Sequence, residues 1–182
     1  MLDIKIRCND LFNSLSYYVN NRILVDPGEY DDNMAAIWYV LLTHAHFDHI
    51  YGLNKVIELN PNVRVYTNDS GREMLLNARK NLSFYHESPF VISDPSRIVT
   101  VEDGDVVDVG TGIKAKAIFT PGHNPSCITW LIDDALFTGD SYIPGLKTVT
   151  NLPGGNRPQA DASIELINHL AQGRTIYPGH KV

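Results

Sequence analysis

The feature that most restricts the fold and the chemistry of this chain is "LLTHAHFDHI", residues 41–50. An apolar run is followed within six positions by four metal-capable side chains: His44, His46, Asp48 and His49. Neutral imidazole and carboxylate are ligands that hold zinc, iron or manganese. His44 and His46 are two residues apart, so both can reach one ion from an extended turn. Asp48 and His49 begin the next helix and point toward a second ion.

The same arrangement recurs three times downstream. "KAIFT" is followed by "PGH", which presents His123; "ALFT" is followed by "GD", which presents Asp140; "TIY" is followed by "PGH", which presents His180. Rigid scaffolds place chemistry on loops at strand ends. If these strands lie side by side with the first, the ligands converge on one rim of the sheet. The two oxygens of Asp140 suit a bridge between ions about 3.5–4 Å apart.

Other reactive residues receive different interpretations. A chance H-x-H-x-D-H in a chain of this composition has odds of about one in a thousand. His86 and His169 follow no strand, so neither is assigned to the site, and His169 is expected to face solvent. Cys127 begins a β-run and is interpreted as a core residue rather than a nucleophile. Asp26 in "ILVDPG" is expected to be structural or to support a ligand instead of binding metal directly.

Composition excludes several classes of protein. With 182 residues, the chain is expected to form a single domain over residues 1–182. The formal net charge of −6 argues against a nucleic-acid partner, which usually requires a basic face. The two cysteines have no C-x-x-C spacing, so no cysteine-built zinc site is indicated. The sequence has neither a signal-peptide h-region nor an apolar stretch of membrane-spanning length, which predicts a cytoplasmic protein without a membrane partner.

Strand patterns outnumber helical ones, which predicts a mixed α/β fold with much antiparallel sheet. "SYYVNNRILVD" predicts a hairpin at Asn20-Asn21, and Asp133-Asp134 predicts another tight turn. "HIYGLNKVIEL" has helical periodicity. In "SGREMLLNARKNL", Ser70 and Glu73 predict a capping box. A last helix is expected near "ASIELINHLAQG".

Together these segments resemble the metallo-β-lactamase superfamily, and most closely its small glyoxalase II-like (hydroxyacylglutathione hydrolase-like) members. "ILVDPG", "LLTHAHFDHIYGL", "AIFTPGHNPS", "ALFTGDS" and "IYPGH" carry the resemblance over nearly the whole chain. It implies a four-layer αββα sandwich, with two sheets back to back and a dinuclear metal site at one rim. It also implies the ligand sets: His44, His46 and His123 for the first metal, Asp48, His49 and His180 for the second, and Asp140 as the bridge.

The expected function is metal-dependent hydrolysis of an ester or thioester carbonyl in a small molecule. A hydroxide bridging two divalent ions, zinc first and iron or manganese as alternatives, attacks the carbonyl. Asp48 ligates the second metal, orients the hydroxide and later shuttles its proton. The expected partner is the small-molecule substrate; the sequence assigns no oligomeric state.

Two alternatives from other classes stand beside this function: a single-iron persulfide dioxygenase on the same scaffold, and a metal-binding module without turnover. Persulfide dioxygenases lack a complete second site, which this chain retains. Glyoxalase II carries a C-terminal helical extension that helps to hold glutathione, whereas this sequence stops two residues after His180. Glutathione thioesters are therefore left open as substrates.

The longest stretch of weak periodicity runs from Ser141 to Asp161. It begins directly after the expected bridging ligand, which makes it a candidate substrate wall. Its polar side chains suited to that role are Tyr142, Lys147, Asn156 and Arg157. Lys147 or Arg157 is expected to recognise an anionic part of the substrate. The alternative is an ordinary connection to the final helix.

Overall fold

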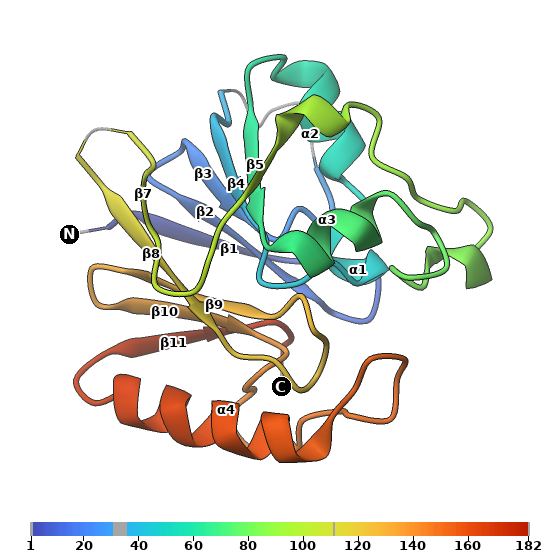
Figure 1. Ribbon diagram of the computed structural model, residues 1–182. Coiled ribbons are helices and arrows are strands. Elements are labelled where there is room, and N and C mark those ends of the chain that lie inside the picture. Colours follow the sequence, from blue (N-terminus) through green and yellow to red (C-terminus); the bar gives the residue numbers. More distant parts are fainter. Residues whose placement is uncertain (1, 31–35, 111, 182) are drawn as a thin grey trace.

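In the computed structural model, which describes residues 2–30, 36–110 and 112–181, two β-sheets pack face to face with helices outside them (Figure 1). The expected αββα sandwich is confirmed. The strand orders are β1-β2-β3-β4-β5-β6 and β11-β10-β9-β8-β7. The first sheet comprises β1 (Ile4–Cys8), β2 (Leu15–Val19), β3 (Ile23–Val25), β4 (Tyr39–Leu41), β5 (Arg64–Thr67) and β6 (Ile98–Thr100). The second comprises β7 (Val106–Asp108), β8 (Lys114–Phe119), β9 (Ile128–Ile132), β10 (Ala135–Gly139) and β11 (Thr175–Pro178).

The helices form the two outer layers. On the side of the first sheet lie α1 (Phe47–Ile50), α2 (Leu53–Leu59) and α3 (Asp69–Leu75), while α4 (Arg157–Leu170) runs along the second sheet (Figure 1). Two short 3₁₀ helices, η1 (Ser83–Tyr85) and η2 (Pro95–Arg97), lie in the connection between α3 and β6. Within the described residues, no helix combines the length and the apolar character needed to cross a membrane.

Side-chain alternation along the first sheet fills two separate cores. Ile23 and Val25 pack between the sheets in a cluster that includes Trp130 and Phe137. Leu24 points the other way, into the cluster beneath the helices. Successive side chains of a strand face opposite sides of its sheet, so β3 is buried on both faces. This accounts for the continuous apolar runs of the sequence.

Helix α4 holds the loop after β8 in place. Ala160, Ser163 and Ile167, spaced three and four residues apart, form the buried face of the helix. The Ser163 hydroxyl donates to the Pro121 carbonyl at 2.6 Å. Gly122 has φ +132°, and a Cβ there would lie 2.2 Å from the Ala160 nitrogen. The loop that carries His123 is thus packed closely against the start of α4.

The expected tight turns are confirmed. Asn20 and Asn21 both have left-handed φ angles, 50° and 54°, and with Arg22 they join β2 to β3 in a tight turn, in which the Arg22 N–H donates to the Val19 carbonyl at 3.2 Å. Asp133, with φ 51°, begins the turn between β9 and β10.

Two local expectations about helices were wrong. Asn68, not Ser70, caps α3: its side chain accepts from the Gly71 N–H, and Ser70 lies inside the helix, so the Ser70–Glu73 capping box does not form. The helical pattern after residue 48 is also split in two. The Gly52 N–H donates to the Pro27 carbonyl instead of to a carbonyl of the preceding helical turn. This interrupts the helical hydrogen bonds and separates α1 from α2.

Two helix bounds also differ from those expected. α3 ends at Leu75, and the Asn77 side chain then accepts from the backbone N–H groups of Arg79 and Lys80, which forms a turn. α4 begins at Arg157, so the last part of the weakly periodic stretch is helical.

Candidate metal centre

The expected ligands come from both sheets and meet at one rim. β4 of the first sheet leads to His44, while β8, β10 and β11 of the second sheet lead to His123, Asp140 and His180. The four strands do not lie side by side in a single sheet, but the strand ends of both sheets meet at this rim. Trp130 on β9 crosses between the sheets and donates its indole N–H to the Leu42 carbonyl at 2.9 Å. Contacts of this kind bring the strand ends of the two sheets together.

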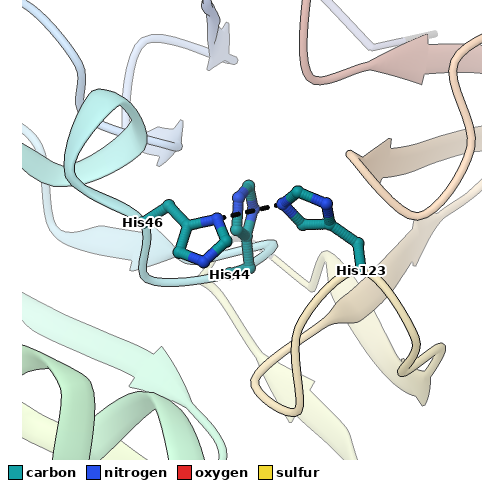
Figure 2. A group of neighbouring side chains, drawn as sticks. All are labelled: His44, His46 and His123. Atoms are coloured by element: carbon teal, nitrogen blue, oxygen red, sulfur yellow. Dashed lines mark hydrogen bonds between the residues drawn. The ribbon is translucent and has the colours of Figure 1, made fainter. Parts of the chain in front are cut away.

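The first group of donors consists of imidazoles alone. Donor nitrogens of His44, His46 and His123 all lie within 4.8 Å of one another, and the three side chains are buried. His46 Nδ1 is 2.9 Å from His123 Nε2, the contact drawn in Figure 2. The ring of His44 lies beside both, with centroid separations of 4.9 Å and 5.0 Å. The geometry suits a three-histidine site for one cation.

The second group combines a carboxylate with two imidazoles. His49 Nε2 lies 3.2 Å from His180 Nε2. Asp48 Oδ2 is 3.3 Å from each of these nitrogens. The three donors of Asp48, His49 and His180 thus share one small volume at the start of α1.

Asp140 joins the two groups. Its Oδ2 lies 3.6 Å from His123 Nε2 in the first group and 3.3 Å from His180 Nε2 in the second. Its Oδ1 lies 3.6 Å from His49 Nε2. Gly179 makes room for this carboxylate, because a Cβ at that position would lie 2.0 Å from Asp140 Oδ1. This is the position that a bridging carboxylate requires.

The donor atoms fit a cation because several of them have no other partner. His44 Nε2 and Asp140 Oδ1 are buried and make no hydrogen bond within the described structure. Buried polar atoms of folded proteins are almost always paired, so such atoms require a ligand. Nε2 of His49 and Nε2 of His180 face each other, so a cation bound beside them could be ligated by both. The residues present therefore fit divalent metal ions.

Outer contacts fix the direction of each imidazole. Nδ1 of His123 lies 2.8 Å from the Val149 carbonyl, and Nδ1 of His180 lies 2.9 Å from the Phe12 carbonyl. A ring nitrogen held from outside leaves the other nitrogen directed into the site. His46 has the opposite orientation: its Nε2 contacts the Asn124 side chain at 3.0 Å, and its Nδ1 points inward.

Asp26 supports the second group from behind. Its carboxylate accepts from the backbone N–H of Thr43 at 2.7 Å and from the Thr43 hydroxyl. The same carboxylate lies 3.2 Å from His49 Nδ1. Asp26 is buried and has a left-handed φ of 52°. The contact with His49 matches the supporting role expected from the sequence.

Burial keeps His44 and His46 of the first group neutral. It lowers the pKa of His44 well below its ordinary value and that of His46 to about 3, with the neighbouring imidazoles adding to the effect. Neutral imidazole is the form that binds metal.

The second group instead favours positive charge. Burial opposes ionisation of Asp48 and Asp140, but nearby imidazoles, His49 foremost, hold the pKa of both carboxyl groups below its ordinary value. Burial also disfavours protonation of His180, yet hydrogen bonds to Asp140 and Asp48 raise its pKa to about 10. Two ionised carboxylates in a buried site require compensating cations, which metal ions supply.

Two open cavities meet at these ligands. One, of about 520 Å³, reaches Asp48, His46, His123, Asp140 and His180. The other, of about 300 Å³, also reaches His123, Asp140 and His180. The larger volume lies within the range of small-molecule sites, and the smaller volume lies at the lower end of that range.

The four expected substrate contacts occupy different places. Lys147 lines the smaller cavity. Asn156 caps α4 by accepting from the Gln159 N–H, and Arg157 pairs with Asp161 at 2.9 Å. The backbone carbonyl of Tyr142 accepts from Thr138. Of these four residues only Lys147 is among the cavity linings, and substrate contact by any of them stays a prediction.

His86 belongs to neither donor group, in agreement with the sequence, but its place in a cavity lining was not predicted. It lines the larger cavity, and its ring packs on Phe47 with centroids 4.7 Å apart. It lies after η1 in a connection without strand or helix periodicity, so no sequence pattern pointed to it. His169 is exposed on α4, as expected. Cys127 is buried beside β9, and burial raises the pKa of its thiol to about 12, which does not favour a nucleophilic role.

Comparison with known proteins identifies the family. The sequence model described as "Metallo-beta-lactamase superfamily" matches residues 9–180. This chain belongs to the metallo-β-lactamase superfamily. It is 32% identical to the probable metallo-hydrolase YqgX of Bacillus subtilis (strain 168) over 78% of the chain and 67% of YqgX. It is 27% identical to a hydroxyacylglutathione hydrolase of Francisella philomiragia over 91% of the chain, but spans only 61% of that protein.

Solved structures of the superfamily share the fold. The crystal structure of the BLEG-1 B3 metallo-β-lactamase superposes with a TM-score of 0.85 at 24% sequence identity, covering 99% of this chain and 92% of BLEG-1. At that identity the likeness concerns the architecture. The resemblance inferred from the sequence is thus confirmed for both family and fold.

Proposed function

We propose that this superfamily member hydrolyses an ester or thioester bond of a small molecule with the help of two divalent metal ions, zinc first. The observation that carries the proposal is the paired donor set: one group of three imidazoles and a second of Asp48, His49 and His180, joined by Asp140. Five members of this set, all except His44 and His49, line an open cavity of about 520 Å³.

The chain's residues divide the work of holding the ions. His44, His46 and His123 would hold one, and the second group would hold the other, with Asp140 between them. Ions bound there would lower the pKa of a water molecule enough to supply hydroxide near neutral pH and would polarise the substrate carbonyl. Asn124, Asp26 and the backbone carbonyls behind the imidazoles keep the donors aimed inward.

Asp48 is the chain's own candidate for proton handling. Its carboxylate takes part in the second donor group and also lines the larger cavity, so it can reach a water molecule beside the substrate. There it would orient the attacking water and hold the proton released from it. Hydrolysis of this kind needs no protein nucleophile, which agrees with the buried position of Cys127.

The relatives support the type of bond. A hydroxyacylglutathione hydrolase is, by its name, a thioester hydrolase, and the chain aligns with about three fifths of the Francisella protein of that name. The second donor group supports a dinuclear hydrolase over a one-metal enzyme, because a single ion needs only one of the two groups.

The test is hydrolysis by the metal-loaded protein. Zinc-loaded protein should release thiol from simple thioesters, lose this activity on chelation and regain it when zinc is restored, while Asp140→Ala should stay inactive. One equivalent of iron together with oxygen uptake on a persulfide would replace the proposal with the dioxygenase. Bound metal without turnover on ester, thioester, lactone and phosphodiester panels would replace it with a binding module.

A further inference from the structure

The metal centre lies where two cavities of different character meet. His123, Asp140, His180, Phe12 and Val149 line both cavities. A bond placed at the metal ligands therefore lies beside both cavities. The chemistry of each cavity then indicates which part of a substrate it accepts.

The larger cavity, here called the apolar lobe, is lined beyond the shared residues by Phe47, Leu82, Tyr85, His86, Leu152 and Pro153, together with the ligands His46 and Asp48. Tyr85 is 76% exposed and Leu152 37%. Large apolar side chains gathered at a functional cavity mark a binding surface, because water contact with such a patch is unfavourable. His86 is a polar side chain of the lobe outside the metal ligands.

The smaller cavity, here called the cationic lobe, is lined beyond the shared residues by Ile143, Leu146, Lys147, Thr148 and Lys181. Two lysines are among the residues that line it, in a chain of net charge −6, and the one carboxylate among those described residues belongs to Asp140 of the metal centre. Among the described residues, no ion pair is recorded for Lys147 or Lys181. Both cations are therefore available to an anion.

We propose that the substrate is a thioester or ester of an apolar acyl group with an anionic leaving group, the acyl chain lying in the apolar lobe and the leaving group in the cationic lobe. This rests on the proposed hydrolase function. Water supplies the oxygen that bonds to the carbonyl carbon, the carbon–sulfur bond breaks, and its electron pair stays on sulfur. The products are a carboxylate, a thiol and one proton.

The lobes are assigned in this direction because the departing sulfur or oxygen takes the electron pair of the broken bond. Ammonium groups beside its path stabilise that negative charge. An acyl chain needs instead a surface that removes it from water, and the apolar lobe has room for one. An acyl chain of six heavy atoms needs less than half of the lobe's volume of about 520 Å³, if each atom takes about 30 Å³, the volume of one water molecule in the liquid.

Four thioesters test the two lobes separately: acetyl and hexanoyl thioesters of neutral mercaptoethanol and of anionic mercaptopropionate. Zinc-loaded protein should have the highest kcat/KM for hexanoyl-mercaptopropionate. The hexanoyl compounds should exceed the acetyl compounds by about tenfold or more, since each methylene withdrawn from water contributes up to roughly fourfold. The mirror compound, a succinyl thioester of hexanethiol, should be a poorer substrate; a higher kcat/KM for it would overturn the assignment of the lobes.

Matched variants locate the two preferences. Tyr85→Ala should lower the hexanoyl-to-acetyl ratio of kcat/KM about threefold, whereas Phe84→Ala, beside it but outside the cavity lining, should not. Lys147→Gln should lower the anionic-to-neutral ratio about three- to fivefold, the effect of an exposed ion pair. Lys116→Gln, the same charge change on β8, serves as its control.

The outcomes separate this inference from the function beneath it. Equal kcat/KM for all four thioesters would overturn the inference and leave the hydrolase in place. If no thioester is hydrolysed, the hydrolase proposal fails. The inference is then tested by calorimetric binding of the corresponding four thioethers, which cannot be cleaved. The hexyl thioether of mercaptopropionate should bind most tightly, and Tyr85→Ala and Lys147→Gln should each weaken it. Equal affinities would overturn the two-lobe assignment.

Discussion

Replacing Asp26 with Asn should weaken the second metal position selectively. The change removes a negative charge from a buried carboxylate that accepts two hydrogen bonds from Thr43 and lies 3.2 Å from His49 Nδ1. Asn keeps the side-chain shape and tolerates the left-handed φ of 52° better than Ala does. The amide can still accept from the Thr43 N–H, but it no longer holds the His49 ring as a charged acceptor.

The expected magnitude follows mainly from the loss of the charged acceptor behind His49. Changing the partner behind a metal-binding histidine typically weakens metal affinity about 10- to 100-fold, or about 1.4–2.8 kcal/mol. Calorimetric titration of zinc into the metal-free protein should show the weaker of two binding events reduced by this factor, with the other unchanged. Asn124→Ala is the matched control, because Asn124 contacts His46 of the first group at 3.0 Å. If Asp26→Asn weakens both events equally, the support of His49 by Asp26 is not specific to the second position.

Three further predictions concern the bridge, the proton and the acid limit of stability. Asp140→Ala should leave no more than one tightly bound metal per chain by elemental analysis and abolish hydrolysis, because Asp140 lies between the two donor groups; two retained metals would contradict the bridge. Asp48→Asn keeps an oxygen donor but loses the proton-handling carboxylate, so kcat should fall about 10²–10⁴-fold with metal largely retained; near-normal turnover would remove that role. Hydrogen bonding to Arg7 lowers the pKa of Glu29 in the folded protein, so Glu29 stabilises the fold above its unfolded pKa and this contribution disappears as pH falls through the folded value. In urea unfolding, the difference between wild type and Glu29→Gln, about 1 kcal/mol or less at neutral pH for so exposed a pair, should therefore vanish in acid; a difference that grows in acid would contradict this assignment.

The candidate ligands could be predicted from the sequence because the signal for each lies in a few neighbouring residues. His44 and His46 directly follow an apolar strand, and the glycine-containing turns before His123 and His180 stand out in the same way. Strand-end placement is a property of a few neighbouring residues, so it is visible without knowledge of the fold. The strand ends do bring these residues together, as the sequence predicted, but local patterns do not show how their strands divide between the two sheets. That division depends on pairing between residues far apart in the chain.

The errors have the same origin. The helix break at Gly52 comes from a hydrogen bond to Pro27, and a Cβ at Gly52 would lie 2.4 Å from the Gly28 carbonyl. No periodicity in the helix itself reveals that contact. At the cavity, His86 packs on Phe47, a contact that no local pattern predicts. Asn68, in contrast, is a typical capping residue that is visible in the sequence two positions before Ser70. Which of the two caps α3 depends on where β5 ends.

Metal stoichiometry tests the central claim most directly. Protein purified without chelator, or saturated with zinc and then desalted, should carry about two metal equivalents per chain by elemental analysis, because two complete donor groups share Asp140. Reproducible binding of one equivalent or less, even with metal added in excess, would contradict the dinuclear centre.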